Sequence, residues 1–130
     1  MAVYIKLTSI IVEDQEKALR FYTDVLGFIK KMDVPMGPEQ RWLTVVSSAA
    51  PDGVELVLEP NLNPAAQVYQ QALFAQKIPI TMLFTEELAV EHARLVALGV
   101  VFTMHPTPMP WGHMSVLNDT CGNLIALVQV

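Results

Sequence analysis

The sequence predicts an α+β fold in which two βαβββ repeats form an open sheet around a cleft. The first observation is a repeat of about 72 positions, because residues 8–14 and 80–86 are both strand-like and both precede a helical stretch. The second is that these helical stretches end in matching triplets, Leu-Gly-Phe at 26–28 and Leu-Gly-Val at 98–100. The third is that each half closes with a strand that follows a glycine, at 53–58 and 122–127.

The repeat also indicates where a ligand would bind. A unit of this size cannot bury its apolar face alone, so two copies must pack together. A cleft shared by two packed units is a common place for a small-molecule site. We therefore expect one domain over residues 1–130, with a first unit at 1–59, a joint at 60–79 and a second unit at 80–130.

The elements of the first unit follow from local patterns. Residues 4–12 alternate and are β-branched, which predicts a strand. Asp14 is a suitable N-cap for the next helix, and Gly27 is a suitable C-terminal residue in the left-handed region. Three further strands are expected at 28–36, 41–48 and 54–59.

The joint and the second unit are expected to follow the same plan. Asn63-Pro64 resembles a helix start, with helical composition over 65–76. Thr85 is the expected N-cap of the next helix, which Gly99 ends. The predicted strands are 80–84, 100–105, 111–118 and 124–130, with an irregular proline-rich segment at 106–110.

Composition limits the classes of function. The net charge is −5 and Lys30-Lys31 is the only basic pair, which argues against a nucleic-acid partner. No apolar run approaches the roughly 20 residues of a membrane helix, and the N-terminus lacks the pattern of a secretory signal. One cysteine, Cys121, fits the reducing cytoplasm, where we expect the protein. The mean hydropathy of +0.38 suggests a lined pocket or a homodimer interface.

The motifs of both halves resemble the vicinal oxygen chelate superfamily. In the first half they are Val12-Glu13-Asp14, Phe21-Tyr22 and Leu26-Gly27-Phe28, and in the second Leu98-Gly99-Val100, Pro110-Trp111-Gly112 and Gly122-Asn123-Leu124. That superfamily includes glyoxalase I, extradiol dioxygenases, fosfomycin-resistance enzymes and bleomycin-resistance proteins. The resemblance covers essentially the whole chain and implies the fold, but its motifs belong to the scaffold and do not identify a reaction.

The resemblance also implies where a metal would bind in related enzymes. Each unit there supplies one ligand from its first strand and one from its last strand. The matching positions here are Leu7, Glu55, Pro79 and Ala126. A catalytic site needs about three donor side chains, and only Glu55 is one. We therefore expect no metal and no other cofactor.

The expected ligand-binding residues are aromatic, thioether, acidic and imidazole side chains: Trp42, Glu55, Met104, Trp111, His113 and Met114. The tryptophans could stack on a planar or cationic guest, although core or dimer packing is the alternative. Methionines, including Met109, suit adaptable binding surfaces. The sequence does not decide on which face of the sheet Trp42, His105 and His113 lie. For the two histidines the reason is that the three prolines between them favour strand bulges.

Glu55 and His113 are the two candidates for catalysis. Glu55 could face the cleft and accept a hydrogen bond or act as a general base. The alternative is a carboxylate held by neighbouring hydroxyls such as Thr44 or Ser115.

The leading hypothesis is a metal-independent protein that holds a small apolar, aromatic or cationic molecule in the cleft. The competing one is a glyoxalase-like lyase or isomerase, or a dioxygenase, with an atypical site around Glu55. A dimer with a vestigial cleft is the third.

Overall fold

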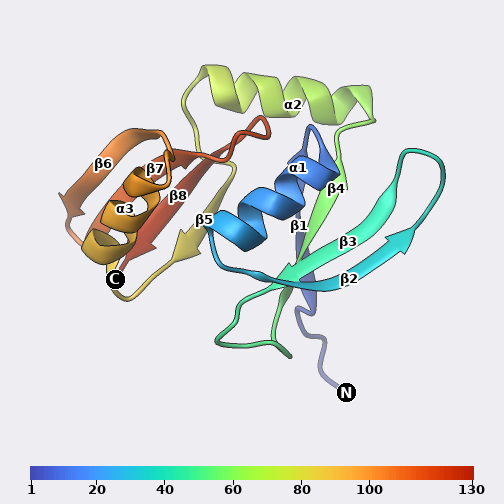
Figure 1. Cartoon of the computed structure of the whole chain (residues 1–130), viewed down its shortest axis with the longest axis horizontal. Helices are drawn as coiled ribbons and strands as arrows, with labels where there is room; N and C mark the ends of the chain where they lie inside the picture. Colours follow the sequence, from blue (N-terminus) through green and yellow to red (C-terminus); the bar gives the residue numbers. More distant parts are fainter. The chain divides into compact units, whose positions relative to one another are not determined.

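The computed structural model describes residues 1–130, and the chain divides into two compact units, Met1–Asn63 and Pro64–Val130. Each unit contains a four-stranded sheet and one helix in the predicted βαβββ order, and the second unit also contains the helix of the joint (Figure 1). The predicted α+β class is therefore confirmed, as two open sheets. None of the α-helices has the length and hydrophobicity that a membrane crossing requires.

The first unit has its strands in the order β1-β4-β3-β2, with β1 parallel to β4 and the other pairs antiparallel. Its elements are β1 (Leu7–Val12), α1 (Gln15–Arg20), a π-helical turn η1 (Phe21–Val25), β2 (Ile29–Pro35), β3 (Arg41–Val46) and β4 (Glu55–Pro60). Asp14 caps α1 as predicted, since its carboxylate accepts a hydrogen bond from the backbone N–H of Lys17 at 2.9 Å. Gly27 has φ 87° and ends the helical segment, also as predicted.

The second unit repeats this arrangement in the order β5-β8-β7-β6. Its elements are α2 (Pro64–Ala75), β5 (Thr81–Phe84), α3 (Leu88–Ala97), β6 (Phe102–Met109), β7 (Gly112–Asn118) and β8 (Leu124–Gln129). The helix expected in the joint is thus present as α2. Gly99 has φ 88°, close to the value of its counterpart in the first unit, because both glycines follow a helix end.

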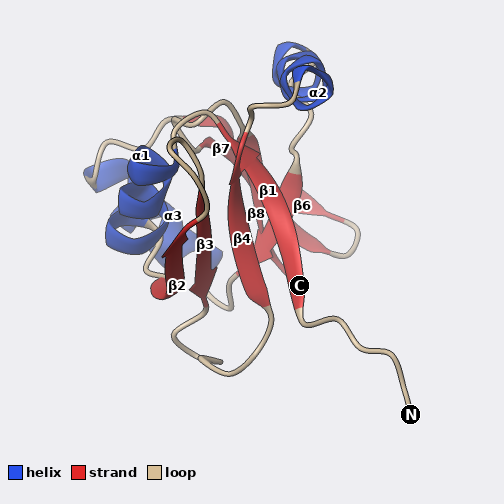
Figure 2. Ribbon diagram, turned by 90° about the vertical axis from the view of Figure 1, so that its right-hand side faces the viewer, coloured by secondary structure: helices blue, strands red, loops and turns tan.

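Helices α1 and α3 each lie on one face of the sheet of their own unit (Figures 1 and 2), and strand alternation shows which residues share that face. In the first unit the side chain of Arg41 reaches Glu16 of α1, so Arg41, Leu43 and Val45 share the face that carries α1. In the second unit Phe102 contacts His92 of α3, and this contact identifies the face that carries α3.

Both helix-covered faces are buried, because apolar side chains of sheet and helix pack together there. In the first unit the core comprises Ile10, Val12, Ala18, Phe21, Tyr22, Leu43, Val45 and Leu58. In the second it includes Leu88, Leu95, Phe102, Leu117 and Ile125. These cores leave the opposite face of each sheet free of its own unit's helix.

Two element predictions for the second unit were wrong. The segment 106–110 is not irregular, because β6 continues through Pro106 and Pro108 to Met109. Proline is tolerated there because β6 is an edge strand, where an outward-facing N–H is not needed, and the register shifts along it absorb the rest.

The start of α3 also differs from the prediction. The N-cap is Glu87 rather than Thr85, and no side chain of the cap residue closes the helix. Instead the side-chain oxygen of Gln129, on β8, accepts a hydrogen bond from the N–H of Leu88 at 2.7 Å. A residue distant in sequence thus satisfies a helix-end donor that a local cap usually satisfies.

Candidate ligand-binding site

Glu55 is the first residue of β4 and lies on the face of the first sheet that is opposite α1. It is 6% exposed, and the hydroxyl of Thr44, on β3, donates to its Oε1 at 2.8 Å. The ammonium of Lys6 lies 3.6 Å from its Oε2. Thr44, one of the two hydroxyls expected near this carboxylate, therefore does hydrogen-bond it. Ser115 donates instead to the carbonyl of Leu127.

The surroundings of Glu55 are mainly apolar. Strand alternation and pairing put Leu7, Met32 and Val34 on the same face, and all three are exposed. Trp42 is half-buried and pairs with Val34, so it also lies on this face. The face opposite α1 therefore combines one buried carboxylate with aliphatic, thioether and indole side chains.

The corresponding face of the second unit, opposite α3, is also apolar. Met104 pairs with Val116, which is two residues from Met114, so the two methionines share this face. Met82 and Phe84 of β5 lie on it as well, because Met82 pairs with Ala126 and Ala126 pairs with Val116. Met82 and Phe84 are exposed. Of the six predicted ligand-binding residues, Met104 and Met114 thus share this face.

Trp111 and His113 are placed differently from the methionines. Pro110 and Trp111 form the two-residue turn between β6 and β7, because Met109 pairs with Gly112. Trp111 is 48% exposed at this turn. His113 pairs with Gln129, whose side chain contacts α3, so His113 lies on the α3 side of the sheet. The sheet therefore separates His113 from Met104 and Met114.

His92 and His105 form a contact that could not be predicted from the sequence. His92 Nε2 and His105 Nδ1 are 2.9 Å apart, and the ring of Phe102 lies against both. The three residues come from α3 and β6. The sequence contains one local indication, the spacing of Phe102 and His105 on one strand. Because that strand contains bulges, the face of the sheet on which each side chain lies could not be predicted from the spacing.

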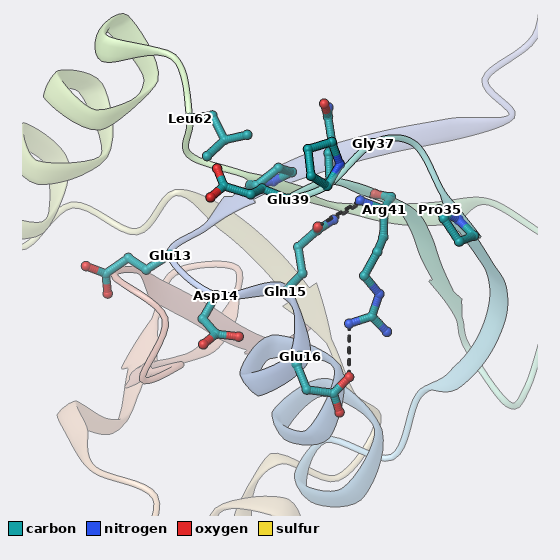
Figure 3. A pocket seen from close by; sticks show the side chains of 12 residues that line it. Glu13, Asp14, Gln15, Glu16, Pro35, Gly37, Glu39, Arg41 and Leu62 are labelled. Carbon is teal, nitrogen blue, oxygen red and sulfur yellow. Dashed lines mark hydrogen bonds and ion pairs between the residues drawn. The ribbon is translucent and has the colours of Figure 1, made fainter.

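A hollow of about 400 Å³ lies in the first unit between the start of α1 and the β2–β3 turn (Figure 3). Its lining is rich in carboxylates and includes Glu13, Asp14, Gln15, Glu16, Glu39 and Arg41. Gln15 is internally satisfied, since its amide donates to the carbonyls of Arg41 and Leu58, both at 2.8 Å. None of the residues predicted to bind a ligand lines this hollow.

The four positions that the resemblance matches to metal ligands lack a set of donor side chains. In the first unit Leu7 pairs directly with Glu55 across β1 and β4. In the second unit the predicted counterparts were Pro79 and Ala126. The strand pairing and the position at which α3 starts show that the counterparts are instead Ile80 and Leu124, whose backbones hydrogen-bond to each other. Leu7, Ile80 and Leu124 have no donor side chain, so these residues do not fit such a centre. No group of three His, Cys, Asp or Glu side chains is arranged to hold a metal ion.

Several known proteins resemble this chain over almost its full length. YurT, an uncharacterized protein of Bacillus subtilis (strain 168), is 52% identical over 125 residues, which cover 96% of this chain and 98% of YurT. The crystal structure of UcmS2 matches with a TM-score of 0.84 and 31% identity, and covers 100% of both chains. TnmS3, an antibiotic binding protein from Streptomyces sp. CB03234, matches with a TM-score of 0.78 and 33% identity over 99% of this chain and 98% of TnmS3.

The family assignment rests on the whole chain and not on one motif. The model of the Glyoxalase/Bleomycin resistance protein/Dioxygenase superfamily matches residues 4–127. This range includes every strand and helix of both βαβββ units except the last two residues of β8. The chain therefore belongs to the Glyoxalase/Bleomycin resistance protein/Dioxygenase superfamily.

Proposed function

We propose that this protein binds a small aromatic or cationic organic molecule without the help of a metal ion, and so sequesters it. Two kinds of observation support the proposal. TnmS3, described as an antibiotic binding protein, is 33% identical over nearly the whole chain. The chain's own residues also lack the donors of a superfamily metal centre, as Leu7, Ile80 and Leu124 illustrate.

The observation that carries the proposal is the makeup of the two sheet faces opposite the helices. Exposed Met32, Val34, Met82 and Phe84 offer adaptable apolar contacts to a planar guest. Monomeric proteins rarely expose large apolar patches without a binding role.

Within this proposal Glu55 selects for positive charge. Its carboxylate is buried, but its only charged partner, Lys6, is 63% exposed and lies 3.6 Å away. A cationic guest would replace the Lys6 ammonium as counter-ion while Thr44 continues to hold the other carboxylate oxygen. The net charge of −5 would favour the approach of such a guest.

The other proposed contacts are Trp42, Met104, Met114 and Trp111. Trp42 would stack beside Glu55, and the methionines would line the face opposite α3. Trp111, at the exposed hairpin turn, would close over the guest. His113 would reach the guest only at this turn, because it lies on the α3 side of β7.

Two substitutions test the proposal, with ethidium as a planar cation and an uncharged anthraquinone as its neutral match. Both guests should quench tryptophan fluorescence, and Trp111→Ala should weaken both by about 1–3 kcal/mol, the scale of a lost buried aromatic contact. Glu55→Gln should weaken ethidium more than the anthraquinone, because it removes only the charge. Glu59→Gln is the matched control, since Glu59 is exposed on the same strand and face. Equal effects of the two glutamine variants would contradict the site.

An enzyme with an atypical centre at Glu55, either a glyoxalase-like lyase or isomerase or a dioxygenase, is the competing function. The observation that favours it is the burial of a carboxylate at a position where related enzymes hold their metal. Elemental analysis of the purified protein separates the two. About one Zn, Ni, Fe or Mn per chain, lost in Glu55→Ala, would support the enzyme and overturn sequestration.

A further inference from the structure

We propose that His92 and His105 form a binding site for a divalent transition-metal ion, with Cu²⁺ as the preferred ion. The site would lie on the α3 side of the second sheet. It is separate from the proposed organic-ligand site, because Met104 and Met114 lie on the opposite face of that sheet. Binding of an ion at these histidines therefore does not depend on the proposed binding of an organic molecule.

The two imidazoles already converge. His92 comes from the middle of α3 and His105 from the middle of β6, and their facing nitrogens Nε2 and Nδ1 are 2.9 Å apart. The ring planes are nearly perpendicular, at 88°. The ring of Phe102 lies beside both imidazoles. Its centroid is 4.6 Å from that of His92, in an edge-on arrangement, and 6.0 Å from that of His105, in a nearly parallel one. Two elements and one aromatic ring thus hold a pair of nitrogen donors in place.

The choice of ion rests on the imidazole donors, and the spacing of the two nitrogens is compatible with a tetragonal ion. For a metal–nitrogen distance of about 2.0 Å, two neighbouring ligands at a right angle lie about 2.8 Å apart, whereas tetrahedral ligands lie about 3.3 Å apart. The observed 2.9 Å is the length of the present hydrogen bond and lies close to the right-angle spacing, so the two nitrogens need little net displacement to reach it. Tetragonal coordination by nitrogen and oxygen is typical of Cu²⁺ and Ni²⁺, and Cu²⁺ binds such donors most strongly among the divalent ions of this series.

Binding requires a rearrangement of protons within the pair but no net loss of a proton from two neutral rings. One of the two facing nitrogens carries the hydrogen of the present hydrogen bond. That ring must shift its hydrogen to its other nitrogen through solvent, after which both facing nitrogens present lone pairs. Each ring must also turn by roughly 45° so that its lone pair points at an ion beside the N···N line. The polar contact is exposed, which allows this turn.

Water would complete the coordination, because no third His, Cys, Asp or Glu side chain is grouped with the two histidines. Glu91 precedes His92 on α3, but its carboxylate accepts hydrogen bonds from Arg94, the shorter at 2.7 Å. Since no third protein donor joins the pair, the ion would exchange with solvent and would be removed by a chelator during purification. This site therefore differs from a resident centre at Glu55.

The test is a Cu²⁺ titration of the chelator-treated protein by isothermal calorimetry, with electron paramagnetic resonance at one ion per chain. We expect His92→Ala and His105→Ala each to weaken Cu²⁺ binding at least tenfold. His113→Ala is the matched control, an exposed histidine on the adjoining strand, and should change binding less than twofold. The resonance spectrum should show two equatorial nitrogens in the wild type and in His113→Ala, and fewer in the other two variants.

Zn²⁺ should bind the wild type more weakly than Cu²⁺ does. The proposal is overturned if His113→Ala loses as much affinity as the pair variants, or if the pair variants keep the wild-type affinity and spectrum. Circular dichroism checks that each variant is folded, and His92→Gln replaces His92→Ala if the alanine variant is not. Glu55→Gln should leave Cu²⁺ binding unchanged, and a loss in that variant would assign the ion to Glu55 and overturn the assignment to the histidines.

Discussion

At the scale of single residues, Arg41 connects β3, β2 and α1 of the first unit. Its Nε and Nη2 donate to the two carboxylate oxygens of Asp33 at 3.0 and 2.7 Å, and its Nη1 donates to Glu16 at 2.9 Å. The hydrogen bonds from Arg41, and then its positive charge, lower the pKa of Asp33 below the ordinary 3.8, although partial burial works against them. The same contacts raise the pKa of Arg41, which stays charged at every accessible pH.

Asp33→Asn should lower the stability of the protein in a pH-dependent way. Because the folded-state pKa of Asp33 is lowered, its stabilising effect is present above the unfolded-state pKa and is lost as the pH falls through the folded-state pKa. The difference in unfolding free energy between wild type and variant should therefore be largest above about pH 4–5 and should shrink toward pH 2. Urea unfolding across pH 2–7 measures it.

Asp52→Asn is the control for this prediction, because the side chain of Asp52 is 98% exposed and only pairs with Lys31 at 3.5 Å. An exposed ion pair of this kind contributes little to the free energy of unfolding. If both variants show the same pH dependence, the contact with Arg41 is not the cause.

At the scale of elements, the β6–β7 hairpin depends on Gly112. Gly112 follows the two-residue turn and has φ 154°, and a Cβ there would overlap the backbone oxygen of Gln129 on β8. This hairpin carries Trp111, the residue proposed to close over a guest. The close approach of two backbones therefore positions the indole.

Gly112→Ala should destabilise the protein by at least about 3 kcal/mol, in the range of severe point substitutions, because backbone atoms of β8 must move. Gly27→Ala is the matched control. Gly27 has φ 87° but open space around its Cβ position. Gly27→Ala should therefore lower the unfolding free energy by only about 1–2 kcal/mol, the cost of a non-glycine residue in the left-handed region. Chemical unfolding compares the two, and equal losses would show that steric overlap is not important at Gly112.

Buried hydrogen bonds of Gln70 join helix α2 to the turn between β7 and β8. Gln70 is 3% exposed, and its amide donates to the carbonyl of Cys121 and to the side chain of Asn123, both at 3.1 Å. Asn123 in turn donates to Asp119, which also accepts from the N–H of Cys121. The turn between β7 and β8 is thereby joined to the helix.

Gln70→Ala should lower the unfolding free energy by about 1–3 kcal/mol, since it leaves buried acceptors without their donor. The exposed neighbour Gln71 provides the control, and Gln71→Ala should change stability by less than about 0.5 kcal/mol. Hydrogen exchange of the α2 amides should accelerate in Gln70→Ala alone. Unchanged exchange would mean that Gln70 does not hold the helix.

At the scale of the whole molecule, the apolar composition predicts self-association. The mean hydropathy is +0.38, and apolar side chains outside the proposed ligand contacts, such as Val90, Val96 and Val101, are exposed in the single chain. An exposed apolar surface of this extent is typical of a protein that pairs with another chain.

We expect a homodimer at micromolar concentration, with twice the chain mass of 14.4 kDa. Light scattering coupled to size-exclusion chromatography measures the mass directly. A monomer at micromolar concentration would contradict the prediction. Dilution should shift the mass toward the monomer only if association is weak.

The sequence by itself determined the fold of this protein. Strand alternation, helical spacing and the turn residues Asp14, Gly27 and Gly99 depend on contacts within a few residues, so they could be recognised locally. The repeat then required two similar units, and the superfamily followed from motifs in the same short segments. The lack of a donor side chain at Leu7 was also visible, because it depends on residue type, whereas its second-unit counterparts, assigned from the sequence to Pro79 and Ala126, are Ile80 and Leu124 in the strand pairing.

Only the tertiary structure decided which residues contact one another across elements. The capping of α3 by Gln129, the hydrogen bond from Thr44 to Glu55 and the pairing of His92 with His105 all join segments distant in the chain. The faces of Met104 and His113 likewise depended on the bulges of a proline-containing edge strand. Since one shift of register moves a side chain to the other face of a sheet, such positions cannot be read from local spacing.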